Sequence, residues 1–256
     1  WLVSYQVSYN IEPFQRQFYL NDVTIQHPHA KRERVNNTEL CLYAVWIPAI
    51  TVGSLGILMT RPKYKFYVTY VSLLGLLISV TLTLVVTDVL KNFIGRARPD
   101  FLARCVPKEG TPRDVLVLAK DVCTTTNKSA LLDGFRTTPS GHSSILFAGL
   151  GYLLLWLSGQ FLAFSDVHLG LWRTVFAFTP ALGAAIIAIS RTEDYRHHFV
   201  DVFIGSTLGL LIAWWSYRRY FPSLVDESSY LPKLVSEKEE EKQTGIYERL
   251  DEEALQ

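Results

Sequence analysis

Five long apolar stretches constrain the fold of this 256-residue chain more than any other feature. Each is close to the roughly 20 residues that cross the hydrocarbon region of a bilayer as a helix, and only the last contains a charged residue, Asp201. The stretches are 41–60, 66–87, 143–165, 174–190 and 199–217. Because backbone polar groups in lipid must be paired within the spanning segment, helices are expected. The sequence therefore predicts an all-α, polytopic membrane helix bundle and not a soluble helical protein.

The amino-terminal segment Trp1–Ile11 is apolar but too short to cross a bilayer alone, and it lacks the basic start of a signal peptide. We interpret it as the end of a truncated first helix, so six transmembrane helices are expected. If the chain begins in the cytosol, the alternation of helices places 10–40, 90–139 and 191–198 on the non-cytosolic side. Basic residues support this orientation only in part, because these loops hold more of them than the opposite ends do.

Charge divides the chain into two parts. The segment 223–256 contains ten acidic and four basic residues, which leaves a net charge of +7 on the remainder. We therefore predict a membrane-embedded domain over 1–222 and an acidic, disordered cytosolic tail over 223–256. A basic membrane part suits an anionic substrate or anionic headgroups. The sequence contains no repeat, glycine-rich nucleotide loop or zinc-ligand spacing, so we predict no cofactor, no metal and no nucleic-acid partner.

Two kinds of residue support the proposed orientation. Asn36 and Asn127 each begin an Asn-X-Ser/Thr triplet in a proposed non-cytosolic loop, which makes both candidate glycosylation sites. Cys105 and Cys123 also lie in such a loop, where an oxidising compartment would allow a disulfide between them, although both could stay reduced. Cys41 is interpreted as a small buried apolar residue.

The first polar cluster is KNFIGRARP, residues 91–99. Lys91 and Arg98 are seven residues apart, close to two helical turns, so both cations can point to one side if the helix continues before Gly95 and Pro99 interrupt it. The alternative is a pair of interfacial basic residues whose charges extend to the lipid headgroups.

The second cluster is PSGH, residues 139–142, where a loop enters an apolar stretch. Ser140 followed by Gly141 leaves unpaired backbone N–H groups at the positive end of a helix dipole, which is a typical anion site. His142 would lie at its rim. The alternative is a histidine with an interfacial or capping role.

The third cluster is SRTEDYRHHFVD, residues 190–201. His197 and Asp201 are four residues apart at the expected start of the last span, so the carboxylate should accept a hydrogen bond from one imidazole nitrogen and leave the other free to attack. A carboxylate inside a span is costly, which favours a functional role over a structural hydrogen bond. Arg191 adds a guanidinium suited to two phosphate oxygens. His198 is interpreted as a neighbour.

Together the three clusters resemble the type-2 phosphatidic acid phosphatase superfamily of lipid phosphate phosphatases and vanadium haloperoxidases. Its signatures K-x6-RP, PSGH and SR-x5-H-x3-D match at 91–99, 139–142 and 190–201, in order and without a departure. The runs EPF at 12–14, RPDFLARC at 98–105 and SRTEDYRHHFVDV at 190–202 are similar to the fungal diacylglycerol pyrophosphate phosphatase branch. The resemblance covers nearly everything except the acidic tail.

The resemblance implies a metal-independent lipid phosphatase in which His197 is the nucleophile, Asp201 orients it and His142 protonates the leaving oxygen. It also implies a set of phosphate-binding groups: Lys91, Arg98, Ser140, Gly141 and Arg191. The expected partner is a phosphorylated glycerolipid in the bilayer, on the non-cytosolic side of a vacuolar, Golgi or plasma membrane.

Three alternatives stay open at this point. The same motifs fit a phosphatase of isoprenoid or dolichyl pyrophosphates or of sphingoid phosphates, because they bind the phosphate and not the leaving group. A lipid-binding or transport protein would keep the basic clusters without needing both histidines and Asp201. A haloperoxidase would share the pocket, but multiple spans fit poorly with a soluble oxidant.

Overall fold

The computed structural model describes residues 11–30, 32–164 and 170–241. Five segments in this part of the chain are long and apolar enough to cross a membrane. The first, Asn37–Met59, runs without a break through α2 (Asn37–Cys41), η2 (Leu42–Trp46) and α3 (Ile47–Met59). The others are α4 (Lys65–Ile94), α8 (Gly141–Gln160), α9 (Leu171–Glu193) and α10 (Phe199–Tyr220). Among the described residues no strand forms, so the predicted all-helical, polytopic fold is confirmed; the predicted partial first helix lies outside them except for Ile11.

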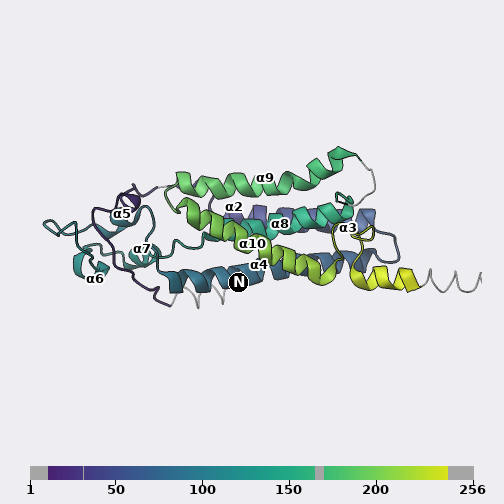
Figure 1. Cartoon of the computed structure of the whole chain (residues 1–256), viewed down its shortest axis with the longest axis horizontal. Coiled ribbons are helices and arrows are strands. Elements are labelled where there is room, and N and C mark those ends of the chain that lie inside the picture. Colours follow the sequence, from purple (N-terminus) through teal and green to yellow (C-terminus); the bar gives the residue numbers. More distant parts are fainter. Residues whose placement is uncertain (1–10, 31, 165–169, 242–256) are drawn as a thin grey trace, which may run out of the picture.

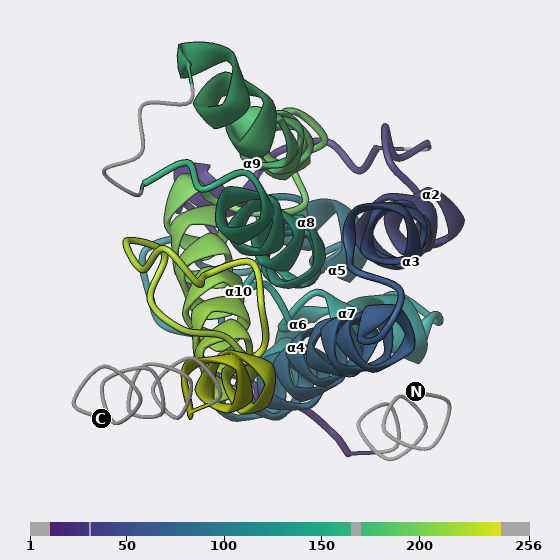
Figure 2. The same cartoon turned by 90° about the vertical axis from the view of Figure 1, so that its right-hand side faces the viewer.

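Helix α8 lies at the centre of the bundle, between α3, α4, α9 and α10 (Figure 2). Its large side chains are almost completely buried, as Leu146, Tyr152 and Trp156 show. One of its polar groups pairs with a neighbouring helix: the Trp156 indole donates to the Ser72 hydroxyl in α4 over 2.8 Å. A central helix that is apolar on all sides needs such partners for its few polar atoms.

Glycines allow the helices around α8 to approach closely. A Cβ on Gly149 would collide with the backbone carbonyl of Ala44 in η2, and a Cβ on Gly209 in α10 would collide with the carbonyl of Ser144. Backbone atoms cannot move aside as a flexible side chain can. The absence of side chains at these two positions therefore sets the spacing of α8 from its neighbours.

We expect Gly149→Ala to destabilise the protein by about 1–3 kcal/mol, because the added methyl group overpacks the contact with Ala44. Gly183→Ala is the matched control, since no atom lies within 4 Å of a Cβ at that helical position. The control should be neutral or stabilising by up to about 1 kcal/mol. Thermal unfolding of the two purified variants in detergent checks this, and equal midpoints would contradict it.

A cap covers one end of the bundle and consists of residues 11–30, 32–36 and 95–140 (Figure 1). It contains η1 (Val23–Ile25) and three short helices, α5 (Phe101–Cys105), α6 (Ala119–Val122) and α7 (Lys128–Asp133). Its own core is built around Phe18, Phe101 and Phe135. Cys105 and Cys123 form a disulfide in this core, with their Cα atoms 4.7 Å apart. The cap is therefore a packed unit and not a set of free loops.

Helix α4 extends seven residues beyond Thr87, where the predicted apolar stretch ends. It continues through Lys91 and stops only at Gly95, which adopts a left-handed conformation with φ of 62° and lies against the carbonyl of Phe14. Glycine is the residue that takes this conformation without strain. The last two turns of α4 therefore carry charged residues out of the apolar layer and into the cap.

The opposite end of the bundle contacts the segment after α10. Residues 233–241 are helical. The Lys233 ammonium donates to the Arg218 carbonyl over 2.6 Å, and the Tyr64 hydroxyl donates to the Glu239 carboxylate over 2.7 Å. The described part of the predicted tail thus packs against the bundle, whereas 242–256 lie outside the described residues. The domain boundary at residue 222 stays a prediction.

Candidate active site

The three polar clusters predicted from the sequence meet where the bundle joins the cap. Lys91 lies near the end of α4, the PSGH run leads into α8, and His197 lies in the link between α9 and α10. Four groups are near enough to affect the charge state of the His197 ring, namely Arg98, Lys91, Arg191 and His142. The fold therefore brings together residues that are up to 106 positions apart in the sequence, from Lys91 to His197.

The His197 ring is buried, with 3% of the residue exposed. Its Nδ1 lies 2.8 Å from the backbone carbonyl oxygen of Thr137 and 3.3 Å from the Thr137 hydroxyl. A carbonyl oxygen can only accept a hydrogen bond, so we assign the ring proton to Nδ1. Nε2 then keeps its lone pair, as a nucleophile requires.

The predicted hydrogen bond between Asp201 and His197 is wrong: the carboxylate makes no such bond in the described structure. The spacing of four places two residues on one face only when both are helical, but α10 begins at Phe199 with His198 as its N-cap. His197 therefore lies outside the helix. The buried Asp201 carboxylate instead accepts hydrogen bonds from Arg96, Thr137, Thr138 and His198.

Asp201 still acts on His197 through one intermediate residue. It accepts from the Thr137 hydroxyl over 2.8 Å, and the carbonyl of the same Thr137 holds the His197 ring. The backbone carbonyl of Asp201 also accepts from the Ser140 N–H over 3.0 Å. Asp201 therefore fixes the segment that leads into α8, and this segment fixes the imidazole.

The start of α8 has the properties of an anion site. Ser140 is the N-cap, and the backbone N–H groups of the first turn, including Gly141, have no carbonyl partner within the helix. A Cβ on Gly141 would lie 3.0 Å from the Lys91 ammonium, so this cation lies directly beside the helix start. Lys91 makes no ion pair in the described part of the chain. Unpaired N–H groups, the helix dipole and an available ammonium together favour a bound phosphate.

His142 and Arg191 are held by the cap segment that precedes α2. Both donate to the Val35 carbonyl, from His142 Nε2 over 3.0 Å and from an Arg191 terminal nitrogen over 3.1 Å. The Arg191 side chain, 2% exposed, is also paired with Glu33 over 2.8 Å and with Asp194 over 3.2 Å. The predicted acid His142 and the predicted phosphate-binding residue Arg191 are thus both hydrogen-bonded to protein oxygens. Because Val35 holds Nε2–H of His142, Nδ1 is the nitrogen left to exchange a proton.

Arg98 is paired with an acid that the sequence analysis did not single out. Its guanidinium donates to the Asp133 carboxylate over 3.0 Å and to the Asp133 carbonyl over 2.9 Å. Asp133 also pairs with Arg104 over 2.8 Å. Burial alone would raise the pKa of the Asp133 carboxyl, but Arg98, Arg104 and Lys91 outweigh burial and hold the pKa well below its usual range. Asp133 is therefore a permanent anion that positions these cations.

Sequence reasoning missed the residues that hold the site together. Thr137 and Thr138 directly precede the PSGH run, and that adjacency was a usable signal. No sequence pattern pointed to Glu33 or Val35 as site residues. Glu33 is one of several acidic residues in loops, and Val35 contributes only its backbone carbonyl. Asn36 and Asn127, the candidate glycosylation sites, cap α2 and α7 with their side-chain oxygens. Their modification stays a prediction.

The surroundings of His197 give its protonation a clear sign. Burial, followed by the positive charges of Arg98 and Lys91, lowers the pKa of His197 well below its usual range. In the unfolded chain, the His197 imidazole takes up a proton at its ordinary pKa of about 6.5. In the folded chain, it takes up that proton only at a lower pH. The stability that depends on a neutral His197 is therefore complete above that pH and is lost as the pH falls below it.

We expect the wild-type protein to lose up to about 1.4 kcal/mol of stability per pH unit below pH 6.5 relative to His197→Gln. Unfolding of both proteins in detergent at pH 7.5 and at pH 5.5 measures this difference. Parallel pH dependences would show that His197 is not buried in its neutral form.

Comparisons with known proteins show the family of this chain. The sequence model described as the PAP2 superfamily matches residues 72–224. The chain belongs to the PAP2 superfamily. It is 50% identical over 254 residues to diacylglycerol pyrophosphate phosphatase 1 of Saccharomyces cerevisiae. This alignment covers 99% of this chain and 87% of the yeast protein. No solved structure matches it.

Two further relatives of this PAP2 protein extend the comparison beyond budding yeast. The probable diacylglycerol pyrophosphate phosphatase 1 of Schizosaccharomyces pombe is 41% identical over 212 residues, 83% of this chain and 74% of the relative. Lipid phosphate phosphatase 2 of Arabidopsis thaliana is 41% identical over 162 residues, 63% of this chain and 54% of the relative. The PAP2 match starts within α4 and ends just after α10, so all three signatures fall inside it, whereas Glu33 and Val35 do not.

Proposed function

We propose that this PAP2 protein is an integral membrane phosphatase that hydrolyses diacylglycerol pyrophosphate, phosphatidate and related lipid phosphates through a phosphohistidine intermediate. Membership of a family whose similar relatives are named lipid phosphatases supports the activity. The observation that carries the mechanism is the buried His197 ring, which has Nδ1 on the Thr137 carbonyl and cations around it.

In the first step, Nε2 of His197 attacks phosphorus and the bond from phosphorus to the leaving oxygen breaks. The leaving oxygen takes a proton from Nδ1 of protonated His142, whose Nε2–H stays on Val35. Lys91 and the N–H groups at the start of α8 stabilise the charge on the transferred phosphoryl oxygens. Arg98 and Arg191 add positive charge near the phosphoryl group without binding it directly. Asp133 holds the Arg98 guanidinium in place, and Glu33 holds that of Arg191.

In the second step, water attacks the phosphohistidine and the phosphorus–nitrogen bond breaks. Neutral His142 accepts the proton from this water, which restores the enzyme and releases inorganic phosphate. The fixed cations take the part that a metal plays in many phosphoryl-transfer enzymes, so we propose that the reaction needs none.

The depth of the site fits a substrate that stays in the membrane. Lys91, Gly141 and Arg191 lie in the end turns of spanning helices, where a headgroup would be while its acyl chains remain in the bilayer. We place this end on the non-cytosolic side of a vacuolar, Golgi or plasma membrane. The disulfide in the cap supports that orientation, because disulfides persist in oxidising compartments.

A phosphate-release panel on the purified protein, with chelator present, tests the function. We expect turnover of diacylglycerol pyrophosphate and phosphatidate that chelator does not reduce and that vanadate inhibits, because vanadate adopts the five-coordinate geometry of the transition state. Isoprenoid pyrophosphates and sphingoid phosphates complete the panel. Higher kcat/KM for one of these would change the substrate, and chelator-sensitive release would contradict the metal-free scheme.

A further inference from the structure

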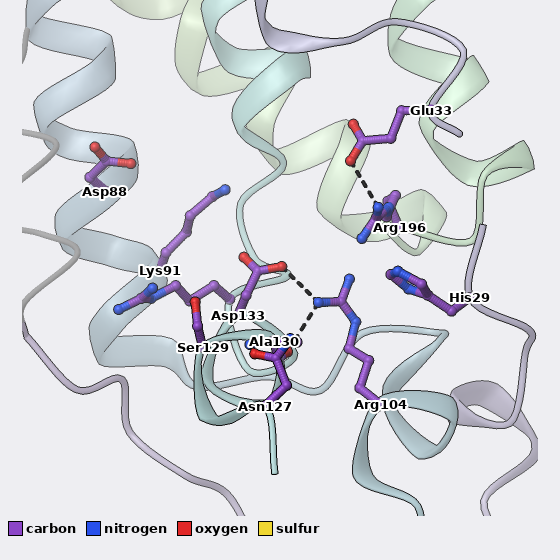
Figure 3. A pocket seen from close by; sticks show the side chains of 11 residues that line it. His29, Glu33, Asp88, Lys91, Arg104, Asn127, Ser129, Ala130, Asp133 and Arg196 are labelled. Carbon is purple, nitrogen blue, oxygen red and sulfur yellow. Dashed lines mark hydrogen bonds and ion pairs between the residues drawn. The ribbon is translucent and has the colours of Figure 1, made fainter. Parts of the chain in front are cut away.

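A cavity of about 440 Å³ lies in the cap, beside the candidate active site (Figure 3). Charged residues dominate its lining. Arg104, Arg136, Arg196 and Lys91 supply the positive charges, and Glu33, Asp88 and Asp133 the negative ones. Its volume is within the range of small-ligand sites, about 300–1,000 Å³. None of the three arginines is a fixed position of the three signatures.

Two arginines of the cavity have N–H groups without a partner. The Arg104 side chain is 4% exposed, and two of its nitrogens bond to Asp100 and Asp133, but the second terminal nitrogen is buried and makes no hydrogen bond within the described residues. In Figure 3 this nitrogen points into the space between Asp133, Arg196 and His29. The Nε of Arg196 is unpaired in the same way. A buried charged donor without an acceptor is costly, so an oxyanion that accepted from these N–H groups would lower that cost.

The neighbouring acids do not satisfy these donors. Glu33 pairs with the terminal nitrogens of Arg191 and Arg196, over 2.8 and 2.9 Å. Asp133 pairs with Arg98 and Arg104. Each carboxylate thus bridges one arginine of the sequence signatures and one arginine that lines the cavity. It holds the cavity arginine in place, but one N–H group of that arginine stays without an acceptor among the described residues. An oxyanion with several oxygens would complete the set.

The cavity is next to the catalytic phosphate site and is not the same site. Lys91 belongs to both, since it lines the cavity and its ammonium lies beside Gly141. His197, Ser140 and His142 do not line the cavity. An anion in it would therefore share Lys91 with a phosphate bound at the start of α8.

We propose that this cavity is a second phosphoryl-binding subsite, in which Arg104 and Arg196 bind a phosphate group next to the one attacked by His197. The inference rests on the proposed function and deepens it. The bound group is either the second phosphate of a pyrophosphate headgroup, which carries one negative charge, or the inorganic phosphate released by hydrolysis. Arginine suits both, because its planar fork can donate to two phosphate oxygens at once.

The test uses Arg104→Lys, which keeps a cation beside Asp100 and Asp133 but removes the unpaired N–H. Arg196→Lys provides a second, independent variant in case the first fails to fold. Arg113→Lys is the matched control, because Arg113 is exposed on the cap and does not line the cavity. Three measurements are made on each full-length protein: kcat/KM for diacylglycerol pyrophosphate, kcat/KM for phosphatidate, and the inhibition constant of inorganic phosphate.

A cavity variant should lower kcat/KM for the pyrophosphate lipid about tenfold more than for phosphatidate if the second phosphate of the substrate binds there. An inhibition constant for inorganic phosphate raised about tenfold, with an unchanged ratio between the lipids, would instead assign the subsite to the product. Equal losses on both lipids with unchanged phosphate inhibition would overturn the proposal, because they indicate a structural role only.

Failure of the proposed function is a separate result, since the wild-type protein would then release phosphate from neither lipid. In that case, thermal stabilisation by inorganic phosphate decides the subsite. Stabilisation that Arg104→Lys and Arg196→Lys lose and Arg113→Lys keeps supports it. Stabilisation that is absent, or equal in all four proteins, rejects it.

Discussion

Replacement of His197 by alanine should lower phosphate release by at least about 10³-fold, because the nitrogen proposed to form the covalent intermediate is removed. The variant should still insert and fold, since the ring makes hydrogen bonds only to Thr137 in the described structure. Phosphate release by the purified variant measures the loss. Brief incubation with radiolabelled substrate, followed by alkaline denaturation, should trap an acid-labile phosphoprotein in the wild type and none in His197→Ala.

His27→Ala is the control for this experiment. His27 lies in the cap and stacks on Tyr195, with ring centroids 4.3 Å apart. It should keep activity within a few-fold of the wild type. Turnover by His197→Ala at a rate near that of His27→Ala would remove His197 from the nucleophile role.

Replacement of Asp201 by asparagine should reduce kcat by about 10²- to 10³-fold, less than the roughly 10⁴-fold seen when a carboxylate bonded directly to a catalytic histidine is lost. The effect is indirect because the carboxylate holds Thr137, and Thr137 holds His197. Asparagine would also turn a hydrogen-bond donor toward groups that can themselves only donate, such as Arg96 and the His198 N–H. Single-turnover kinetics measure the loss in the chemical step.

Thr137→Val separates this indirect arrangement from a direct one. Valine keeps the backbone carbonyl on His197 but loses the hydroxyl that donates to Asp201, so activity should fall about tenfold, as expected for one hydrogen bond to a charged group. Thr81→Val, an exposed threonine that bonds only within α4, is the matched control. If both threonine variants match the wild type while Asp201→Asn is impaired, the relay through Thr137 is excluded.

The helices were predictable because the bilayer imposes a simple pattern on the sequence. Length and hydropathy located all five described spans, and the last begins at Phe199 as predicted. The ends of helices within the cap were not predictable in this way. Helix α4 runs past Asp88 and Lys91, since charged residues end an apolar stretch but do not end a helix. Gly95, which does end it, was visible as a helix-breaking residue.

The site was predictable only in part, for a different reason. Residue types and spacing identified Lys91, the start of α8 and His197, because their chemistry is unusual at the end of an apolar span. The contacts between them depend on tertiary structure. The spacing of His197 and Asp201 predicted that both lie on one helix face, but α10 begins between them. A shift of one residue in the start of a helix is enough to change which residues share a face, and sequence patterns do not fix helix ends that closely. Contacts through backbone carbonyls, such as that of Val35, leave no trace in side-chain patterns.

Residues 33–35 contact His142 and Arg191, so they belong to the structural unit that holds the candidate active site. A fragment cut to 72–224, the region that the family match covers, would contain every signature residue and yet lack the groups that hold two of them. It would also lack α3 and the backbone of η2 against which Gly149 packs. We therefore expect the catalytic unit to be larger than the homology domain, because residues early in the chain contact helices that are synthesised after them.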